Sequence, residues 1–553
     1  MSQPTNQRTY RDGETVDFVI VGSGAAGGVL ANELATAGFD VVVLEQGPWQ
    51  RPEQFTHDEL EIERENAMLN TAFEPFQTFR TTDAEQPRRN PNRGLAYRRG
   101  VGGSSVHFAA NYWRFRPVDF VERSKWGPIS GTGFADWPIT YDELEPYYTK
   151  VDWEIGVSGA PGPSDPRRSR PYPLPPMPNK SSGVLLERGA KALGLHAQVS
   201  PMAILSQPYD GRSPCMACGH CTYYGCEFGA KSSSLSTVIP KAVATGRCDI
   251  RVESTVFRVE TNAAGRATGV AYWDRAGKER RQSAKAVILA ANGAETARLL
   301  LLSSSPQFPQ GLANSSGNVG RHIMFNGHTS TFGRFEHPLN EYKGAVTSRV
   351  IHDFYDADAK RGFYGGGGID ARFPYGPLGF ALDVFPKDTP TWGAEYKRAL
   401  RDHYAHSVRF MAHITSLPVA GNTVSLDPAH PDRWGRPGLC LTFQDHPNDV
   451  KSVEWFQGRT HELMEAAGAT HIWDQPILPT DSSVQLLGTA RMGNDPRDSV
   501  VDRYHRAHDL PNLFICDGSS FVTSGRGQPT MTIQALAFRA ADHIARFARS
   551  NAI

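Results

Sequence analysis

Neither sign of charge is in excess in this 553-residue sequence, which carries 58 Lys and Arg residues against 58 Asp and Glu residues. That balance gives no reason to expect a nucleic acid or an acidic membrane as a partner. Long apolar runs are also missing: none approaches the ~18 residues that a membrane-spanning helix needs. The polar start "MSQPTNQRTYRDGETVDF" lacks the apolar core of a signal peptide. We therefore expect a cytoplasmic protein with no membrane span, while export together with a partner subunit stays open.

Cysteine is scarce, with seven residues in the whole chain, and disulfides are not expected in a reducing cytoplasm. Three cysteines are isolated and are predicted to be buried apolar fillers, namely Cys248, Cys440 and Cys516. The other four lie within "CMACGHCTYYGC", whose spacing C-x2-C-x2-C-x4-C is close to the ferredoxin pattern C-x2-C-x2-C-x3-C-P. An iron–sulfur cluster, a zinc site and four reduced thiols without a metal stay open. The predicted metal ligands are Cys215, Cys218, Cys221 and Cys226.

Apolar periodicity and turn residues divide the chain into regions of different kinds. A buried strand over 18–21 is followed by a Gly-rich turn, a helix and the second strand "VVVLE", which together predict a βαβ unit. The same strand–turn–helix order returns near residue 285 and at "NLFICDGSS". A Pro-rich stretch over 160–179 indicates a linker, and short alternating runs over 331–480 indicate a second, sheet-containing domain. Two or more domains are also what the length predicts.

The first turn carries the motif Gly22-x-Gly24-x-x-Gly27, directly after a strand and at the start of a helix. The first glycine permits the tight turn, the second lets the backbone approach a pyrophosphate, and the third allows close helix–strand packing. Glu45 ends the second strand, where an acidic side chain can accept hydrogen bonds from a ribose. The motif predicts a bound dinucleotide and does not distinguish FAD from NAD.

Several longer stretches follow one another in an order typical of one enzyme family. They are "VIVGSGAAGG…LEQG", "RGVGGSSVHFAANYWRFRP", "AANGAETARLLLLSS", "NVGRHIM" and "GTARMGNDPRDSVVD…PTMTIQALAFRAADHI". From about residue 15 onward the chain resembles the glucose–methanol–choline (GMC) oxidoreductases, and within them the branch of pyranose oxidase and the gluconate dehydrogenase flavoprotein. The resemblance implies FAD and an α/β fold, with a doubly wound Rossmann-like FAD domain and a substrate domain on a mixed or antiparallel sheet. The implied FAD domain comprises 15–150, 210–330 and 481–553, with a linker and cap over 151–209 and the substrate domain over 331–480.

The resemblance also implies further contacts with FAD. Some members of the branch bond FAD covalently to a histidine at the position of His107, so a flavin tether and a neutral histidine packed beside the flavin both stay open. Asp517 is predicted to reach the pyrophosphate and ribityl chain, with an ordinary helix cap as the alternative. Besides the residues of the first motif, the implied FAD-binding residues are Gly102, Gly103, Ser104, Ser105, His107, Val256, Ala291, Asp517, Gly518 and Pro529.

The chain departs from the family at the catalytic positions. Where the family has a histidine before the Gly-Thr of "GTARMG" and a histidine or asparagine in the last loop, this sequence has Gln485 and Gln528. A carboxamide can orient a substrate oxygen but cannot accept a proton at neutral pH. Gln485 and Gln528 are therefore the predicted catalytic residues without being the base. A base from the substrate domain, a substrate that needs none, and non-standard or lost activity all stay open.

The function implied by the resemblance is oxidation of a CH–OH donor, a sugar or related polyol, with hydride transfer to FAD. If the cysteines hold an iron–sulfur cluster, electrons would leave one at a time to an electron-acceptor protein or a small partner subunit, which favours a dehydrogenase over an oxidase. The alternative is a flavoprotein of the same fold with lyase-like chemistry or none, motivated by the two glutamines.

Overall fold

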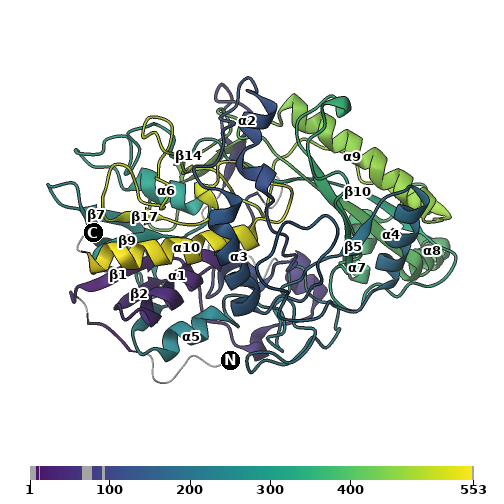
Figure 1. Ribbon diagram of the computed structural model, residues 1–553, viewed down its shortest axis with the longest axis horizontal. Coiled ribbons are helices and arrows are strands. Elements are labelled where there is room, and N and C mark those ends of the chain that lie inside the picture. Colours follow the sequence, from purple (N-terminus) through teal and green to yellow (C-terminus); the bar gives the residue numbers. More distant parts are fainter. Residues whose placement is uncertain (1–7, 12, 65–76, 90–93, 551–552) are drawn as a thin grey trace.

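The computed structural model describes residues 8–11, 13–64, 77–89, 94–550 and 553 (Figure 1). Two large sheets lie at opposite ends of the long axis, each with its own helices (Figure 1). None of the described helices is both long and apolar enough to cross a membrane.

The first sheet has seven strands in the order β6-β2-β1-β9-β8-β7, with β17 pairing β9. The pairs β6–β2, β2–β1, β1–β9 and β9–β17 are parallel, and all four residues of β2 are buried, as expected for a parallel sheet covered on both faces. This confirms the predicted α/β class with a Rossmann-like sheet. The strands are β1 (Val16–Val21), β2 (Val41–Leu44), β6 (Cys248–Arg251), β7 (Thr255–Thr261), β8 (Ala267–Trp273), β9 (Glu279–Leu289) and β17 (Leu513–Ile515).

The second sheet is antiparallel throughout, with six strands in the order β16-β10-β13-β12-β11-β5. Alternate residues of β13 face opposite sides, because side chains in a strand alternate. Val408, Phe410, Ala412 and Ile414 are fully buried in a core shared with α4 and α9, which leaves Arg409, Met411 and His413 on the other face. The strands are β5 (Ala197–Val199), β10 (Gly327–Arg334), β11 (Arg349–Ile351), β12 (Gly367–Arg372), β13 (Ser407–Ile414) and β16 (His471–Asp474).

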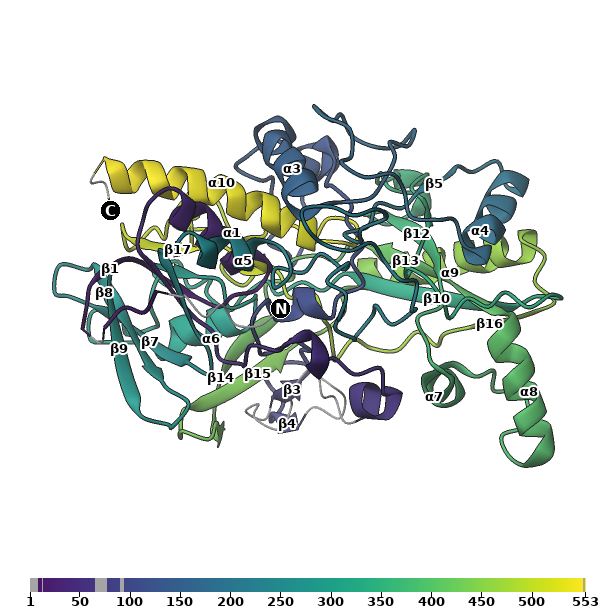
Figure 2. The same ribbon diagram turned by 90° about the horizontal axis from the view of Figure 1, so that it is seen from below.

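A third, four-stranded sheet runs in the order β14-β15-β3-β4. Figure 2 shows α1 and α10 on one side of the first sheet, and α6 with β14 and β15 on the other. The strands are β3 (Thr78–Arg80), β4 (Arg88–Arg89), β14 (Thr423–Pro431) and β15 (Pro437–Thr442). The α-helices are α1 (Ala25–Thr36), α2 (Glu122–Trp126), α3 (Tyr141–Ile155), α4 (Ser181–Ala192), α5 (Val238–Ala244), α6 (Glu295–Leu302), α7 (Pro377–Gly379), α8 (Gly393–His406), α9 (Pro447–Ala466) and α10 (Thr530–Arg549).

Local sequence fixes the ends of the longer elements. The α3 helix begins at a capping box, in which Thr140 Oγ1 accepts from the Glu143 amide at 3.2 Å and the Glu143 carboxylate accepts from the Thr140 amide at 2.8 Å. It ends at Gly156, which is left-handed as helix C-termini prefer. The β5 strand of the second sheet comes from the segment predicted to be linker and cap, and the domain boundaries themselves stay a prediction. Cys248, Cys440 and Cys516 are buried, as predicted.

Candidate active site

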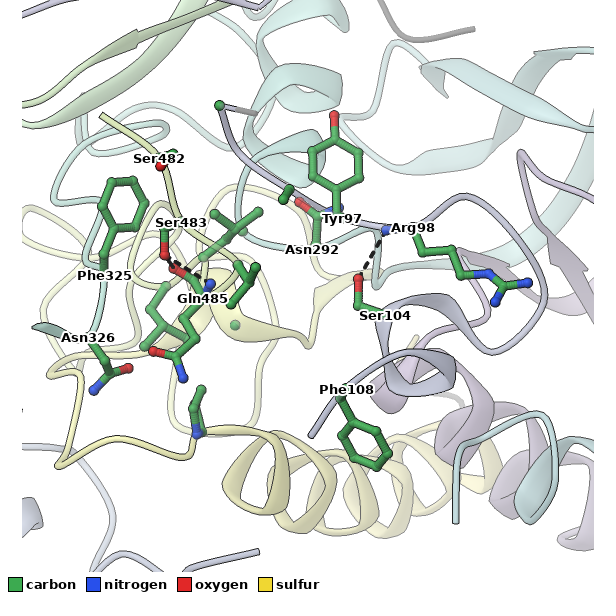
Figure 3. Close-up of a pocket in the computed structure, with 18 of the residues that line it drawn as sticks. Tyr97, Arg98, Ser104, Phe108, Asn292, Phe325, Asn326, Ser482, Ser483 and Gln485 are labelled. Carbon is green, nitrogen blue, oxygen red and sulfur yellow. Dashed lines mark hydrogen bonds between the residues drawn. The ribbon is translucent and has the colours of Figure 1, made fainter. Parts of the chain in front are cut away.

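A cavity of about 2170 Å³ lies between the first and second sheets. Its walls come from the β1–α1 turn, the segment 94–111, the loops after β9 and β17, the loop before α10, and the polar face of β10, β12 and β13. Figure 3 shows Gln485 beside Asn326, on the side of the cavity opposite Ser104. The predicted site residues that line it are Gly22, Gly24, Glu45, Gly103, Ser104, Ser105, His107, Val256, Ala291, Gln485, Asp517, Gly518, Gln528 and Pro529.

Gly27 and Gly102 do not line the cavity but shape the loops that do. A Cβ atom at Gly27 would lie 2.0 Å from the Gly22 carbonyl oxygen, so this position requires glycine for the turn to close on α1. Gly102 has φ +92°, a left-handed conformation that favours glycine, and its amide donates to Ser23 Oγ at 3.2 Å. The two Gly-rich loops thus meet and form one end of the cavity.

The N-terminus of α1 fits a pyrophosphate. Gly24 is its N-cap, and among the residues that the structure describes no side chain caps the first amides of this 12-residue helix. Such free amides, at the positive end of the helix dipole, bind phosphate groups. A Cβ atom at Gly103 would lie 2.8 Å from the Gly24 Cα, so the second loop leaves no room for a side chain at Gly103. The donor set therefore fits the dinucleotide that the motif predicts.

Glu45 holds the Gly-rich loops together. Its Oε2 accepts from the amide and hydroxyl of Ser23 at 3.1 and 2.7 Å, and its Oε1 accepts from the amides of Gly47 and Gly100 at 3.0 and 3.1 Å. Burial raises the pKa of this carboxyl above its ordinary value, and these hydrogen bonds oppose the rise. The predicted hydrogen bond between Glu45 and a ribose stays a prediction. Both carboxylate oxygens already accept hydrogen bonds from protein donors.

Asp517 ties together the ends of β9 and β17. Its Oδ2 accepts from the Asn292 amide at 3.1 Å and from Thr296 Oγ1 at 2.6 Å, and its Oδ1 accepts from the Ser519 amide at 2.8 Å. The last bond caps the short 3₁₀ helix Gly518–Ser520. The carboxylate thus caps a helix and also lines the cavity, so the two predicted roles are compatible.

His107 follows the 3₁₀ helix Gly103–Val106 and has an unused ring nitrogen. The side chain is 4% exposed, and within the described part of the chain its buried Nε2 has no hydrogen-bond partner. Burial, with the charges of Arg98 and Lys231, lowers the pKa of His107 to about 3, so the imidazole is neutral. An unpaired ring nitrogen on a residue that lines the cavity fits a flavin neighbour, and both the tether and the packed neutral histidine remain predictions.

The two glutamines sit on adjacent loops. Gln485 Nε2 donates to the Gly527 carbonyl at 2.8 Å, and its buried Oε1 has no partner among the residues that the structure describes. Gln528 Nε2 lies 3.0 Å from Nδ1 of His413. One amide oxygen is therefore free to accept a hydrogen bond from a ligand, and the other amide contacts a histidine of the second sheet.

His413 was not predicted from the sequence. It lines the cavity, is 1% exposed, and its Nε2 lies 3.0 Å from Oδ2 of the fully buried Asp370 on β12. The stretch "SVRFMAHI" alternates apolar residues with Arg409, Met411 and His413, and this alternation was the available signal.

The cysteine segment packs against the cavity wall. Thr222 and Tyr223 line the cavity, and the Tyr223 amide donates to the His107 carbonyl at 2.8 Å. Beneath them, the buried Lys231 Nζ donates to the carbonyls of Cys221, Tyr224 and Phe108 at 2.5, 2.7 and 3.1 Å. The segment is therefore fixed directly to the loop that carries His107.

The cysteine segment contributes donor atoms to one group that could hold a metal ion. Burial raises the pKa of the Cys221 thiol to about 12, and the neighbouring thiols Cys215, Cys218 and Cys226 add to the rise while Lys231 opposes it. Within the described ranges, the group of donor atoms that lie within 4.8 Å of one another is His57, Cys218 and His220 rather than the four sulfurs. Donors this close suit one ion, whereas the thiolates of a multi-iron cluster are spread around its inorganic core. His57, from a distant loop, was not predicted.

Comparison with known proteins gives consistent matches. Family models described as GMC oxidoreductase match residues 16–324 and 418–537. The chain is 35% identical over 548 residues to the 2-methyl-1,2-propanediol dehydrogenase of Mycolicibacterium austroafricanum, covering 96% of both chains. It is 31% identical to the fructose dehydrogenase large subunit of Gluconobacter japonicus, covering 96% of this chain and 98% of that one. Among solved structures, a formate oxidase from Aspergillus oryzae superposes with a TM-score of 0.65 at 17% identity, covering 98% of this chain and all of the other.

Proposed function

Because the chain belongs to the GMC oxidoreductase family and is thus an FAD-dependent oxidoreductase, we propose that it is a dehydrogenase of a small polyol or sugar. The observation that carries the proposal is the cavity itself. One end is formed by Gly-rich loops and an uncapped helix N-terminus, and the other by hydrogen-bonding side chains suited to hydroxyl groups.

The FAD end of the cavity would be held by the first motif and the two loops that meet it. Gly24 and the N-terminus of α1 would receive the pyrophosphate, Asp517 would lie beside the sugar–phosphate chain, and His107 would lie beside the flavin. When bound there, FAD supplies a two-electron acceptor for a hydride.

The substrate end favours a ligand with several hydroxyl groups. The unpaired Oε1 of Gln485 can accept a hydrogen bond from one hydroxyl, and Asn326 and Gln528 add amide groups on the same wall. A site that pairs its buried polar groups with substrate hydroxyls strongly rejects analogues that lack them. The two relatives named above, a propanediol dehydrogenase and a fructose dehydrogenase, favour donors of the same class.

Flavin reduction tests this function. We expect that mixing the protein anaerobically with vicinal diols and with sugars bleaches the flavin absorbance for at least one of them. Reoxidation by a one-electron dye but not by O₂ would support a dehydrogenase, whereas rapid reoxidation by O₂ would indicate an oxidase. No bleaching by any alcohol, or substrate turnover without bleaching, would instead favour the inactive or lyase-like alternative that the two glutamines motivate.

The cysteine segment is proposed as the route by which electrons leave. An iron–sulfur cluster on Cys215, Cys218, Cys221 and Cys226 would lie beside the loop that carries His107, and would pass electrons to an acceptor protein or small partner subunit. The rival is a single-ion site made of His57, Cys218 and His220. An iron–sulfur cluster would support the dehydrogenase proposal, whereas a single-ion site would be structural.

Metal analysis of anaerobically purified variants separates the two sites. Iron and acid-labile sulfide that are lost in Cys221→Ser and kept in His57→Ala would support the cluster. Zinc that is lost in His57→Ala and kept in Cys221→Ser would support the single-ion site. Protein that carries neither metal at stoichiometric amounts would reject both.

A further inference from the structure

The carboxamides of Gln485 and Gln528 cannot take the proton of a substrate hydroxyl, so an alcohol dehydrogenase built on this cavity needs another base. We propose that His413 is that base and that Asp370 is the residue that positions it. The inference rests on the proposed function and names the residue that receives the proton.

The fold presents His413 to the substrate end of the cavity. Strand alternation turns its side chain to the same face of β13 as Arg409 and Met411, and all three line the cavity. The ring meets the edge of Trp113 at 5.3 Å and 89°. A Cβ atom at Gly527 would lie 2.6 Å from the His413 Cβ, so the loop that carries Gln528 packs directly on this histidine.

The contacts of the two ring nitrogens select one tautomer. Nε2 faces the Asp370 carboxylate at 3.0 Å, and an ionised carboxylate only accepts hydrogen bonds, so Nε2 carries the proton. The lone pair then lies on Nδ1, which is the nitrogen that faces Gln528. Arg372 Nη2 also lies 3.0 Å from Nε2, but it is a donor, and it pairs with the Asp370 carboxylate instead.

Asp370 is built to stay ionised. Its side chain is fully buried, and it accepts from Arg372 Nε at 2.6 Å and from Asn111 Nδ2 at 3.0 Å. Burial alone would raise its pKa, but Arg372 and His413 hold the pKa of Asp370 well below its usual range. The carboxylate is therefore available both to fix the tautomer and to stabilise an imidazolium.

His413 is neutral before the reaction. Burial lowers its pKa, the Asp370 carboxylate opposes the shift, and the cations of Arg372 and Arg409 add to it. Two further histidines pack around it: His328 on β10, at 5.1 Å between ring centroids, and His352, which lies against Trp113. Burial also holds the pKa of each of these two well below the ordinary value, so neither places a charge beside the base.

The step balances with FAD as the oxidant. The substrate O–H bond breaks and its proton goes to His413 Nδ1, while the oxygen keeps the electron pair and the C=O bond forms. The carbinol hydrogen would leave with its bonding pair, for which FAD, when bound, would be the two-electron acceptor. At rest Gln528 Nε2 donates to the Nδ1 lone pair, so this amide has to turn away before the substrate hydroxyl can donate to Nδ1. Proton transfer to a positioned base contributes roughly 10²- to 10⁴-fold to such rates.

Substrate-driven flavin reduction in His413→Gln tests the base directly. We expect a loss of about 10²- to 10⁴-fold in rate, with FAD content and reduction by dithionite unchanged. In wild type the rate should fall at acidic pH as His413 protonates, below the ordinary histidine range, and this dependence should vanish in the variant. The matched control is His352→Gln, a buried histidine that also packs against Trp113 but does not line the cavity, and this variant should react within a few-fold of wild type.

A second measurement is independent of turnover. In ¹⁵N-histidine-labelled holoprotein near pH 7.5, the signals absent from His413→Gln should report an Nε2–H tautomer with unprotonated Nδ1, and Asp370→Asn should change that tautomer. Should His413→Gln fail to bind FAD, Asp370→Asn carries the kinetic test, with a slower reduction expected.

The possible results distinguish a failure of the proposed base from a failure of the proposed function. A wild type that is reduced by an alcohol, together with a His413→Gln that is reduced within tenfold of it, would overturn this inference alone. A protonated Nδ1 in wild type would overturn it as well. A wild type that no alcohol reduces would overturn the proposed function and this inference together.

Discussion

Replacing Arg526 by methionine should lower the free energy of unfolding more than the substitution of any surface residue. The guanidinium is completely buried; its Nη1 lies 2.9 Å from Asp119 Oδ1, its Nη2 pairs with Glu122, and its Nε donates to the Tyr355 carbonyl at 2.9 Å. Asp119 also accepts from the Tyr355 hydroxyl at 2.6 Å. The arginine thus joins the loop before α10 to the segment 117–126 and to the connection between β11 and β12.

The magnitude follows from what the substitution leaves behind. Methionine fills much of the same volume, so the main loss is the cation, and two buried carboxylates remain without it. Removing one partner of a buried ion pair costs about 3–5 kcal/mol, because the remaining charge is uncompensated. The control Arg167→Met removes a pair with Asp142 in which both side chains are more than two-thirds exposed, and such pairs contribute less than about 1 kcal/mol.

The effect should depend on pH in a defined direction. Burial raises the pKa of Asp119 from 3.8 to about 6 in spite of Arg526, so the folded protein binds more protons than the unfolded chain between these values. The contribution of Asp119 to the free energy of unfolding is therefore greatest below pH 4 and declines as the pH rises to about 6. Without Arg526 the folded pKa rises further and the decline continues above pH 6. The difference in the free energy of unfolding between wild type and Arg526→Met should thus be larger at pH 8 than at pH 5.

Urea unfolding followed by tryptophan fluorescence at pH 5 and pH 8 measures both quantities. We expect a large fall in the midpoint for Arg526→Met, greater at pH 8, and little change for Arg167→Met at either pH. A fall no larger than that of the control, or one that is larger at pH 5, would refute the reasoning from uncompensated buried carboxylates.

Three further predictions concern the cavity walls. Gly27→Ala places a Cβ atom 2.0 Å from the Gly22 oxygen. This overlap costs about 1–3 kcal/mol and should lower FAD affinity roughly tenfold or more. In the control Gly458→Ala the Cβ atom meets nothing within 4 Å, so this variant should keep its full flavin content, and equal flavin content in both variants would contradict the packing argument. Lys231→Met leaves three carbonyl oxygens without their donor at about 1–3 kcal/mol each, so its urea midpoint should fall, and an unchanged midpoint would show that other donors replace it. If FAD is tethered to His107, acid precipitation should leave the flavin in the pellet for wild type and release it for His107→Ala, whereas release from wild type would exclude the tether.

The dinucleotide end of the cavity could be predicted because its contacts are local. The motif from Gly22 to Gly27 specifies a strand, a turn and a helix within a few residues, and Glu45 follows on the next strand. The four-way bonding of Glu45 could not be predicted, because its donors include Gly100, which is remote in sequence and enters only through the fold.

The catalytic end could be located only in part. The positions of Gln485 and Gln528 follow from their neighbouring motifs, and both line the cavity. The partner of Gln528, His413, lies 115 residues away in the chain on a strand with no motif, and Asp370 comes from a further strand. Hydrogen bonds between such distant segments depend on strand register and on the loop that covers the sheet, and neither is visible in local sequence.

The polar face of β13 shows why a histidine of this kind escapes sequence analysis. Alternation of Val408, Phe410, Ala412 and Ile414 with polar residues predicts a half-buried strand, and the polar face of such a strand normally lies in solvent. Here the loop with Gly527 covers that face, so His413 is buried beside a carboxylate instead of hydrated. If that histidine is the base, the pH dependence of the reaction is set by the second sheet, whereas the loop positions at which the family carries its histidine keep only the task of orienting the substrate. Charges on β12 and β13, such as Arg372 and Arg409, would then tune the rate without touching the flavin end of the cavity.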